Sequence, residues 1–363
     1  MQISGYRNLK PVCLTFGSNV NFIYGKNAQG KTNLIEAIWM FTGARSFRGT
    51  KDVDLVNFEE SSAKLQGRFF LEQRSQEIAV FFSGGKRKIF LNGVAKPYPT
   101  SIIGKFRVVL FSPVQLSLVT GGPEGRRKFL DAAICQLKPT FLSKVSQYNK
   151  ALKQRNALLK DISLQQSLGL LEVWDEKLAK LGSEIVRERL DYFEFLKQEA
   201  FKIYCEISGL AETLKINYIS SFAKNFMPET SASELYAQLK TKLEKSRNSD
   251  IKSGFTNFGA HKDDLEFLVN DKKIKFFGSQ GQQRSVALSL KLAEAAGAEK
   301  FIGEPPVILL DDVMSELDDY RKNYMIEKIT GKQVFITNCD ASVYEKFENG
   351  KLFEVENGVV KEF

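Results

Sequence analysis

A short run of residues near the amino terminus has the pattern of a phosphate-binding loop. Residues 25–32 read Gly-Lys-Asn-Ala-Gln-Gly-Lys-Thr, which matches G-x-x-x-x-G-K-T. In such a loop, backbone N–H groups and the start of the next helix point at the phosphates of a nucleotide. The Lys31 ammonium would reach the β- and γ-phosphates, and the Thr32 hydroxyl would ligate Mg²⁺. The candidate nucleotide-binding residues here are Gly25, Lys26, Asn27, Ala28, Gln29, Gly30, Lys31, Thr32 and Asn33.

A pair of carboxylates follows an apolar run late in the chain. Residues 307–312 read Val-Ile-Leu-Leu-Asp-Asp, so Asp311 ends the run and Asp312 follows it. Asp311 is the candidate for holding Mg²⁺, and Asp312 is the candidate for orienting or deprotonating an attacking water. Asp312 and Lys31 are therefore the expected catalytic residues. The alternative is that the aspartates only cap a following helix, which would involve no chemistry.

Strands and helices must position both motifs. Residues 21–24 read as a strand that enters the glycine loop, and an apolar stripe after the loop predicts a helix ending at Gly43. Residues 305–312 and 332–340 read as further buried strands. Buried strands separated by helical stretches predict a parallel sheet with helices on its faces.

The middle of the chain has a different texture, which predicts a second lobe. The chain has 363 residues and 43% hydrophobic content, enough for a packed core and about two domains. Residues 126–206 are rich in helix-forming residues with helical spacing of apolar side chains, and residues 242–253 read as a polar loop. We therefore expect an α/β lobe split between 1–121 and 254–363, with a mainly α-helical lobe at 122–253 inserted.

Composition excludes some classes of protein. The four cysteines form no C-x-x-C pair, so neither a disulfide framework nor a zinc site is predicted. No apolar run approaches the ~20 residues of a membrane span, and no signal peptide is evident, so we expect a soluble cytoplasmic protein. The formal charge of +9 favours a nucleic acid partner or, alternatively, a solvated basic surface. The cations at 86–88, at the tip of a predicted hairpin over 77–93, allow the same two interpretations.

A third motif precedes the acidic strand. Residues 279–282 read Ser-Gln-Gly-Gln, the pattern S-x-G-Q, and a helix is predicted to follow. Ser279 alone could cap that helix. Together with the glycine loop, the acidic strand and the Ser-Glu-Leu-Asp after it, the motif resembles the signature of ABC-type ATPases. The resemblance implies that two chains dimerise around ATP, each contributing to the other's nucleotide site. The residues implied in that role are Ser279, Gly281, Gln282, Gln283 and Asp318.

Longer blocks extend the resemblance to one family. The blocks are GYRNL (5–9), GARSFRGTKDVDLV (43–56), FSPVQLSLVTGGPEGRRKFLD (111–131), GAHKDDLEF (259–267), SQGQQRSVALSLKLAE (279–294) and LLDDVMSELD (309–318). They are similar to RecF, a family of bacterial replication and repair proteins related to SMC heads. The resemblance implies an ABC-type ATPase head without long coiled-coil arms, and ATP and Mg²⁺ as cofactors. It also implies DNA binding at single-strand gaps and duplex junctions. The sequence contains no base-reading module, so we expect recognition of the DNA backbone and shape without base specificity. The implied partners are RecR directly, and RecO and RecA indirectly, in recombinational repair and the SOS response.

Some positions depart from the family's pattern. Where the family usually reads Pro-Glu-Asp, residues 113–115 read Pro-Val-Gln, and Gln115 is a candidate for the role of the superfamily's Q-loop glutamine. His261 is the only histidine, and it lies far in sequence from Thr337 and Asn338, where many ABC ATPases place a switch histidine. For His261 we expect structural hydrogen bonding or a contact with the helical lobe, and no general-base role.

Three functions fit these motifs to different degrees. A transporter engine is disfavoured because the gap from Thr32 to Ser279 exceeds that class's compact helical subdomain. Asp312 stands where most ABC ATPases have Glu, and its side chain is one methylene shorter, which predicts real but slow hydrolysis. We therefore expect a weak, DNA-stimulated ATPase, converting ATP and water to ADP and phosphate, that uses its nucleotide as a timer. The alternative is a DNA-binding scaffold that holds ATP without hydrolysing it.

Overall fold

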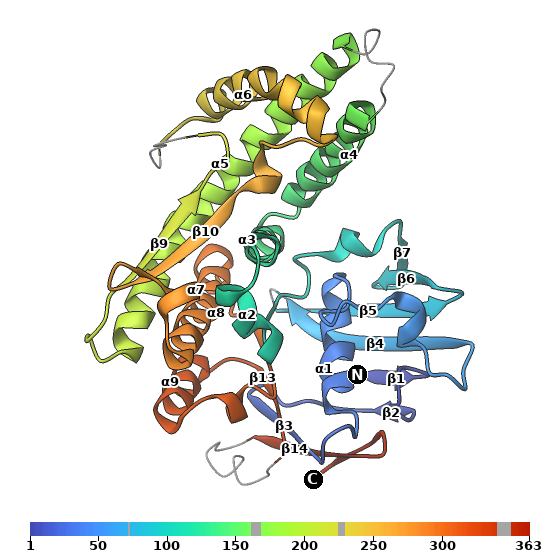
Figure 1. The fold of residues 1–363 in the computed structure, drawn as a ribbon. Helices are drawn as coiled ribbons and strands as arrows, with labels where there is room; N and C mark the ends of the chain where they lie inside the picture. The colour runs from blue at the N-terminus through green and yellow to red at the C-terminus, as the bar shows by residue number, and fades with distance from the viewer. Residues whose placement is uncertain (72, 161–167, 224–228, 340–349) are drawn as a thin grey trace. The chain divides into compact units, whose positions relative to one another are not determined.

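A computed structural model of the chain describes residues 1–71, 73–160, 168–223, 229–339 and 350–363 (Figure 1). The chain forms two compact units: the first joins Met1–Gln115 to Glu294–Phe363, and the second is Leu116–Ala293. Helices α2 (Pro113–Thr120) and α8 (Gln280–Ile302) each contribute residues to both units. No helix within the described ranges is long and apolar enough to cross a membrane.

The first unit contains a mostly parallel sheet. Its strand order is β15, β14, β3, β13, β12, β8, and only β15 runs antiparallel to its neighbour. In chain order the strands are β3 (Val20–Tyr24), β8 (Val108–Phe111), β12 (Val307–Asp311), β13 (Val334–Asn338), β14 (Lys351–Glu356) and β15 (Val359–Glu362). The central residues of β3, β12 and β13 are buried, which explains their near-continuous apolar sequence and confirms the predicted parallel sheet.

An antiparallel sheet forms the other layer of the first unit. Its order is β2 (Val12–Cys13), β1 (Gln2–Ser4), β4 (Ser62–Leu71), β5 (Arg74–Ser83), β6 (Lys86–Leu91) and β7 (Val94–Lys96). The predicted hairpin is confirmed, because β5 pairs with β6 and Ser83 lies opposite Lys86. The two glycines between them have φ of +55° and +70°, as a two-residue hairpin turn requires.

One apolar core joins both sheets through helix α1 (Lys31–Trp39). Leu34, Ile35 and Ile38 of α1 are buried in it, together with side chains of β4, β5, β8, β12 and β13. The helix continues as a 3-10 turn, η1 (Met40–Thr42), and Gly43 ends it with φ of +79°, at the predicted position. The remaining elements of this unit are η2 (Asp52–Leu55), η3 (Pro99–Ile102), η6 (Met314–Glu316) and α9 (Asp319–Ile329).

The second unit is mainly helical. Its long helices are α3 (Pro123–Leu137), α4 (Thr140–Lys160), α5 (Leu168–Ile207) and α6 (Ala232–Ser253), and α5 packs on both α4 and α6 (Figure 1). A small antiparallel sheet in the order β11 (Lys272–Lys273), β10 (Asp264–Val269), β9 (Leu214–Ile219) belongs to the same unit. The short helix η5 (Ala260–Lys262) directly precedes β10 in sequence, and the short helix α7 (Ile274–Phe277) directly follows β11.

One local expectation is wrong. Residues 242–253, which read as a polar loop, form the end of α6. Ser231 and Glu234 open this helix with a capping box, and Gly254 ends it with φ of +73°. The buried side of α6 carries Leu235, Leu239 and Leu243 at helical spacing, but it continues with the polar Ser246 and Asp250, so the end of the helix has no apolar stripe.

Candidate functional site

The glycine loop connects the end of β3 to the start of α1. Gly25 and Gly30 have φ of +151° and +123°, values that glycine adopts readily and other residues resist. The chain also approaches Gly25 closely, since a Cβ there would lie 2.2 Å from the carbonyl oxygen of Val355. The two glycines of the motif are therefore geometric requirements of this loop.

The Lys31 side chain folds under the loop that precedes it. Its ammonium donates hydrogen bonds to the carbonyl oxygens of Gly25 at 2.6 Å and Lys26 at 3.1 Å. The side chain is buried although it is charged, and the Cys339 Sγ lies 3.4 Å from the same nitrogen. A desolvated cation beside a helix N-terminus attracts anions strongly, so this arrangement can hold a phosphate chain.

Asp311, at the carboxyl end of β12, lies directly beside the loop. Thr32 Oγ1 donates to Asp311 Oδ1 at 2.9 Å, and Thr337 Oγ1 donates to the same oxygen at 3.0 Å. Burial raises the pKa of Asp311 above its ordinary value, and the two hydroxyl donors oppose that rise. The fold thus brings together the two candidate metal ligands, which are 279 positions apart in the sequence.

These two residues fit a magnesium ion chemically. Mg²⁺ prefers oxygen ligands and is usually bound through one or two protein groups together with substrate phosphates. The Thr32 hydroxyl and the Asp311 carboxylate offer a neutral and an anionic oxygen on adjacent elements. Within the described residues no group of three or more His, Cys, Asp or Glu side chains could hold a metal. When bound, Mg²⁺ would offset the negative charge of the phosphates.

Asp312 differs from its neighbour in backbone and in exposure. Its φ is +52°, in the left-handed region that Asp tolerates better than most residues. Its backbone N–H donates to Thr337 Oγ1 at 2.9 Å, while its partly exposed side chain lines the pocket in front of the loop. Unusual backbone conformations of this kind concentrate at functional sites. The carboxylate is placed to act on a water inside that pocket.

The pocket itself has a volume of about 560 Å³. One wall consists of the glycine loop, the start of α1 and Asp312. The lining also includes residues that the sequence analysis did not assign to the site, among them Arg7, Asn8, Arg48 and Phe58. The Phe58 ring is fully exposed at the lip of the pocket, where it offers an apolar face to a ligand. The pocket therefore combines cations for phosphate with an aromatic ring suited to a base.

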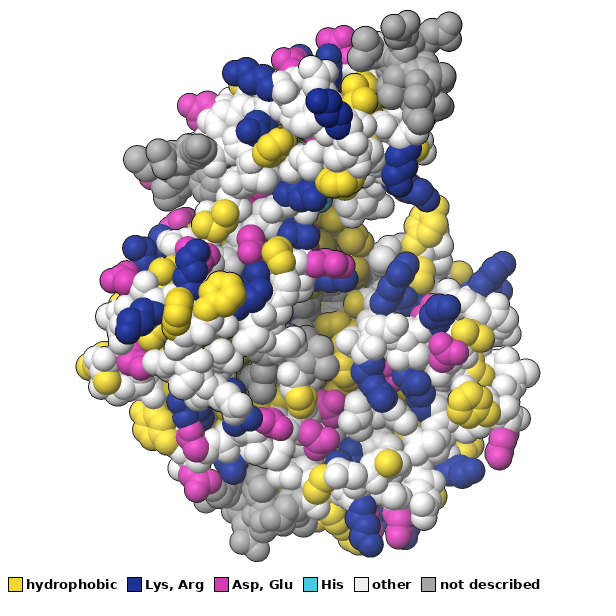
Figure 2. Space-filling view, viewed as in Figure 1, with side chains coloured by type: hydrophobic (Ala, Val, Ile, Leu, Met, Phe, Trp, Pro, Cys, Tyr) yellow, Lys and Arg dark blue, Asp and Glu magenta, His cyan; other side chains and the backbone are white. Residues whose placement is uncertain are grey.

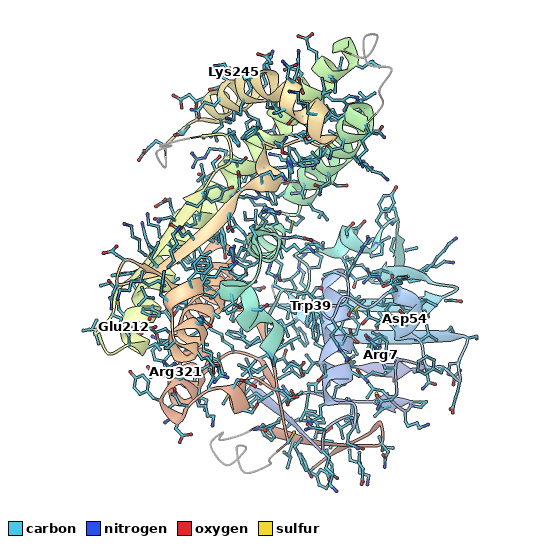
Figure 3. The ribbon with its side chains drawn as sticks, viewed as in Figure 1. Arg7, Trp39, Asp54, Glu212, Lys245 and Arg321 are labelled. Carbon is cyan, nitrogen blue, oxygen red and sulfur yellow. The ribbon has the colours of Figure 1, made fainter. Side chains whose placement is uncertain are left out.

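A buried carboxylate holds Arg7, one of the cations that line the pocket, in place. Arg7 lies 3.0 Å from Glu36 of α1, whose side chain has no exposed surface, and Ser46 also donates to Glu36. Arg7 further donates to the backbone carbonyl of Asp54 at 3.2 Å, and Figure 3 shows the two residues close together. The blocks GYRNL and GARSFRG contain Arg7 and Arg48, but no spacing rule links those blocks to a phosphate loop.

The S-x-G-Q motif opens helix α8 in the second unit. Ser279 Oγ accepts from the Gln282 N–H at 3.2 Å, and Gln282 Oε1 accepts from the Ser279 N–H at 2.9 Å, which forms a reciprocal capping box. Gln282 also donates to Glu212, labelled in Figure 3, at 2.5 Å. Gln283 donates to backbone carbonyls of the preceding turn. Ser279 is thus a helix cap, and the helix start, with Gly281 in its first turn, carries the positive dipole end that suits an anion.

Three other candidate residues lie in separate surroundings. Asp318 caps α9, because its Oδ1 accepts from the Arg321 N–H at 2.9 Å. Gln115 belongs to α2, and its side chain lies outside the described part of the structure. His261 accepts from the Tyr148 hydroxyl at 2.8 Å through Nδ1 and donates to the Thr256 carbonyl oxygen at 3.1 Å through Nε2. This is the structural hydrogen bonding expected for His261, and burial lowers its pKa to about 4.

Comparisons with known proteins identify relatives over the whole chain. A family model described as an AAA domain matches residues 1–334. The "DNA replication and repair protein RecF" of an Exiguobacterium species is 39% identical over 366 residues, covering 99% of this chain and 98% of the relative. Its counterpart in Lactobacillus gasseri is 37% identical over 364 residues, covering 99% and 97%.

Solved structures show the same likeness in three dimensions. A structure of "the recombination mediator protein RecF" with an ATP analogue, described as part of the RecFOR pathway, has a TM-score of 0.92. It is 39% identical, and the match covers 100% of this chain and 96% of that one. An Smc head domain from Pyrococcus furiosus has a TM-score of 0.57 at 17% identity, covering 100% and 94%, which supports the fold alone. The fold is that of an ABC-type ATPase head.

Proposed function

Because this chain belongs to the RecF family of DNA replication and repair proteins and carries the family's AAA domain, we propose that it is a DNA-binding ATPase of recombinational repair. In this proposal it dimerises on ATP, binds DNA at single-strand gaps or duplex junctions, and hydrolyses ATP slowly as a timer. The observation that carries the proposal is the 2.9 Å hydrogen bond from Thr32 to Asp311 beside the glycine loop. A glycine turn that bound no nucleotide would need neither the buried ammonium nor the buried carboxylate beside it.

Each residue of the pocket has a defined task in the proposed reaction. The loop N–H groups and Lys31 hold the phosphates, and the cationic wall formed by Arg7 and Arg48 adds positive charge. Thr32 and Asp311 hold Mg²⁺ together with the phosphates. Asp312 accepts a proton from the attacking water as that water reaches the terminal phosphate.

Slow turnover is argued from the surroundings of Asp312. The side chain is one methylene shorter than the Glu of most ABC ATPases, so its carboxylate reaches less far into the pocket. At the end of β13, the Thr337 hydroxyl is already engaged by Asp311 and by the backbone of Asp312. Threonine does not titrate in the ordinary pH range, so Thr337 offers no acid or base that could help Asp312 orient the water.

DNA binding is argued from charge and from the relatives. The formal charge is +9, and in Figure 2 Lys and Arg side chains are spread over the visible face with acidic side chains between them. Dispersed cations suit contacts with the phosphate backbone, which carry no base specificity. A related RecF structure is described within the RecFOR pathway. For this chain we propose RecR as the direct partner, with RecO and RecA acting beyond it.

The proposal is tested by removing the phosphate-binding charge. Lys31→Ala in the full chain should abolish ATP binding and ATP-dependent retention on a gapped duplex, because it removes the ammonium that lies against the carbonyl oxygens of Gly25 and Lys26. Lys361→Ala, at an exposed lysine on β15 in the same unit, is the matched control and should behave as the parent. ATP affinity and DNA retention would be measured by filter binding, and turnover by phosphate release.

The outcomes separate the proposed functions. Unchanged ATP binding in a folded Lys31→Ala protein would contradict the nucleotide site. ATP-dependent DNA retention by a parent protein that releases no phosphate would favour the non-hydrolysing scaffold, which the short reach of Asp312 makes the second candidate. DNA affinity should also fall with salt, with a slope of roughly −0.9 in log–log form for each phosphate contacted on duplex DNA.

A further inference from the structure

A second hollow, of about 600 Å³, lies in the first unit away from the nucleotide pocket. Its lining includes Arg107, Pro305 and Gln333, which lie just before β8, β12 and β13 respectively. The hollow is therefore at the amino ends of these parallel strands, whereas Asp311 and the glycine loop lie at the carboxyl ends of β12 and β3. The proposed ATPase function makes no use of it.

Aromatic rings form the walls of this hollow. Phe69 of β4 meets Phe106 at 5.1 Å between ring centroids, Phe41 meets Phe106 at 6.1 Å, and Phe16 meets Phe335 at 4.8 Å, all in edge-to-face contacts. These rings hold one another in fixed positions, so the walls are preformed. Phe70, next along β4, also lines the hollow, and 80% of its surface is exposed. An exposed aromatic ring beside a preformed apolar hollow is typical of a contact surface.

Positive charge surrounds the same hollow. The charged side chains in its lining are Arg68, Lys105, Arg107 and one carboxylate, Glu304, which pairs with Arg107 at 3.6 Å. Lys105 is exposed and forms no ion pair with any residue in the described ranges. Arg68 pairs with Glu77 at 3.0 Å, but with 79% of its side chain exposed this pair is screened by solvent and contributes little. Arg107 is paired with Glu304 and only 14% of its side chain is exposed, so Lys105 and Arg68 are the cations that remain available to a negatively charged ligand.

We propose that this hollow binds an acidic segment of a partner protein, which inserts one large apolar side chain between the phenylalanines while its carboxylates meet Lys105 and Arg68. The apolar walls would supply affinity, because a buried aromatic or long aliphatic side chain is worth far more than an exposed one. The cations would supply orientation and a faster encounter at low salt.

A single-stranded nucleic acid fits the hollow less well. Such ligands need a groove that follows the backbone, and ring faces on which successive bases stack. Here the rings Phe16, Phe69 and Phe106 meet their neighbours edge to face and are packed into the core. The three cations surround one compact hollow and form no extended track. One side chain flanked by carboxylates is the ligand that matches this shape and charge.

The test uses the full chain and labelled ten-residue peptides. One peptide is rich in Asp with a central Phe, a second replaces that Phe with Ala, and a third replaces the Asp residues with Lys. Fluorescence anisotropy should give an affinity at least about tenfold higher for the first peptide than for either of the others. A labelled oligo-dT of ten nucleotides is measured alongside them.

Two variants locate the binding. Lys105→Glu reverses the unpaired rim charge, and Phe70→Ala removes the exposed ring; each should weaken binding of the Asp/Phe peptide at least tenfold. Lys88→Glu, on the exposed face of β6 outside the hollow, should leave peptide binding unchanged. Both rim residues are exposed, so ATP affinity at the glycine loop should be preserved and serves as the folding control. Equal affinity for the Phe and Ala peptides, or unaltered peptide binding in both rim variants, would overturn the proposal. It would also be overturned if the rim variants lost affinity for oligo-dT and not for the Asp/Phe peptide.

Discussion

Two adjacent carboxylates at the end of β12 have different surroundings, and the difference suggests a division of labour. Asp311 is buried and accepts from Thr32 and Thr337, so its position is fixed beside the glycine loop. Asp312 has a left-handed backbone and a partly exposed carboxylate that lines the pocket. A fixed anion suits a cation that must stay in place, whereas an exposed carboxylate facing the pocket suits proton transfer with water.

Amide substitutions should separate these two roles. Asp312→Asn keeps the size of the side chain but removes its basicity, so it should bind ATP normally and lower turnover by about 10²-fold or more. Asp311→Asn should instead raise the Mg²⁺ concentration needed for half-maximal ATP binding, because an anionic ligand becomes neutral. Filter binding across a Mg²⁺ titration and phosphate release distinguish the two variants. Parental turnover in Asp312→Asn would exclude it as the base.

Asp311→Asn has a second expected consequence that reports on folding alone. Burial raises the pKa of Asp311, so the folded chain holds its charged form at a cost at neutral pH. The amide removes that cost and can still accept from both threonines. The variant should therefore unfold at an equal or higher denaturant concentration than the parent at pH 7, although its Mg²⁺ handling is worse. This opposition of stability and function is common at active sites.

For single residues of the candidate site, the sequence predicts those that lie together in one short motif. It does not predict residues that reach the pocket from distant parts of the chain. Gly25, Lys31 and Thr32 were predictable because one short segment supplies both the loop and the helix start that position them. Arg7 and Phe58 were missed because the antiparallel sheet brings them to the pocket, and no local pattern encodes that approach. The capping interpretation of Ser279 is visible in the structure, while its role toward a nucleotide stays a prediction.

At the scale of elements, one buried arginine ties the helical unit together. Arg155 of α4 has no exposed side-chain surface and donates to Asp175 of α5 at 2.6 Å. It also donates to Asp250 of α6 at 2.7 Å and to Thr256 at 2.8 Å. The guanidinium therefore connects its own helix α4 to α5 and α6. It does so in an interior where ions are tolerated only when they are paired.

Truncation of this arginine should destabilise the second unit strongly. Arg155→Ala leaves the buried carboxylate of Asp250 without its cation, while Asp175 keeps its pair with Arg247 at 2.7 Å, and we expect a loss of about 3–5 kcal/mol in the free energy of unfolding. Lys128→Ala is the matched control: its pair with Glu124 is exposed by 75% and 72%, and such pairs contribute about 0–1 kcal/mol. Urea unfolding followed by circular dichroism measures both. Equal effects of the two substitutions would show that the buried network does not hold the helices together.

His261 should make the stability of the same unit depend on pH. Its pKa is lowered to about 4 in the folded chain by burial, against an ordinary value of 6.5. Between these values the unfolded chain binds a proton that the folded chain does not, so stability is full above pH 6.5 and falls as the pH drops toward 4. The full loss amounts to about 3 kcal/mol, at about 1.36 kcal/mol per pKa unit.

A single variant can isolate this effect because the chain contains one histidine. His261→Gln can still accept from Tyr148 and donate to Thr256, but it does not titrate. Denaturant unfolding at intervals from pH 6.5 to 5, above the range where most carboxylates titrate, should show a falling midpoint for the parent and a flatter one for the variant. Parallel curves would mean that His261 is protonated in the folded chain or that its surroundings open before it titrates.

The elements themselves were predictable to different extents. The buried strands β3, β12 and β13 and the helix after the loop have strong local signals, because burial on both faces gives continuous apolar runs. Helix α6 was missed over 242–253 because its buried face there carries the polar Ser246 and Asp250, and Asp250 accepts from Arg155 in a tertiary contact that no local pattern encodes. Strand β9 was not recognised because its pairing partner β10 lies beyond α6 in the sequence, so its register depends on tertiary contacts.

At the scale of the whole molecule, the proposed ATPase is incomplete as a single chain. The glycine loop and the acidic strand belong to the first unit, while the S-x-G-Q motif at the start of α8 belongs to the second. Resemblance to ABC-type ATPases implies that this motif acts on the nucleotide of another protomer. If each ATP is buried between two chains, ATP stabilises the dimer by mass action, and specific activity rises with protein concentration.

Variants at Ser279 can test this dimer without touching the chain's own loop. Ser279 caps α8, so Ser279→Ala loses only the cap, about 1 kcal/mol, whereas Ser279→Arg adds bulk and charge to the surface that would face the partner. Ser279→Arg should therefore abolish turnover and the ATP-induced rise in sedimentation coefficient while leaving ATP binding intact, and Ser279→Ala should retain most of both.

Mixing variants then shows whether the two chains share sites. In a heterodimer of Ser279→Arg with Lys31→Ala, one composite site carries both defects and the other carries neither, so some turnover should return if one intact site can act alone. Each variant by itself should stay inactive at every concentration, which makes the recovered activity specific to the mixed dimer. Specific activity that stays flat with concentration, together with a sedimentation coefficient that ATP leaves unchanged, would rule out the shared site. The nucleotide would then control DNA binding within one chain.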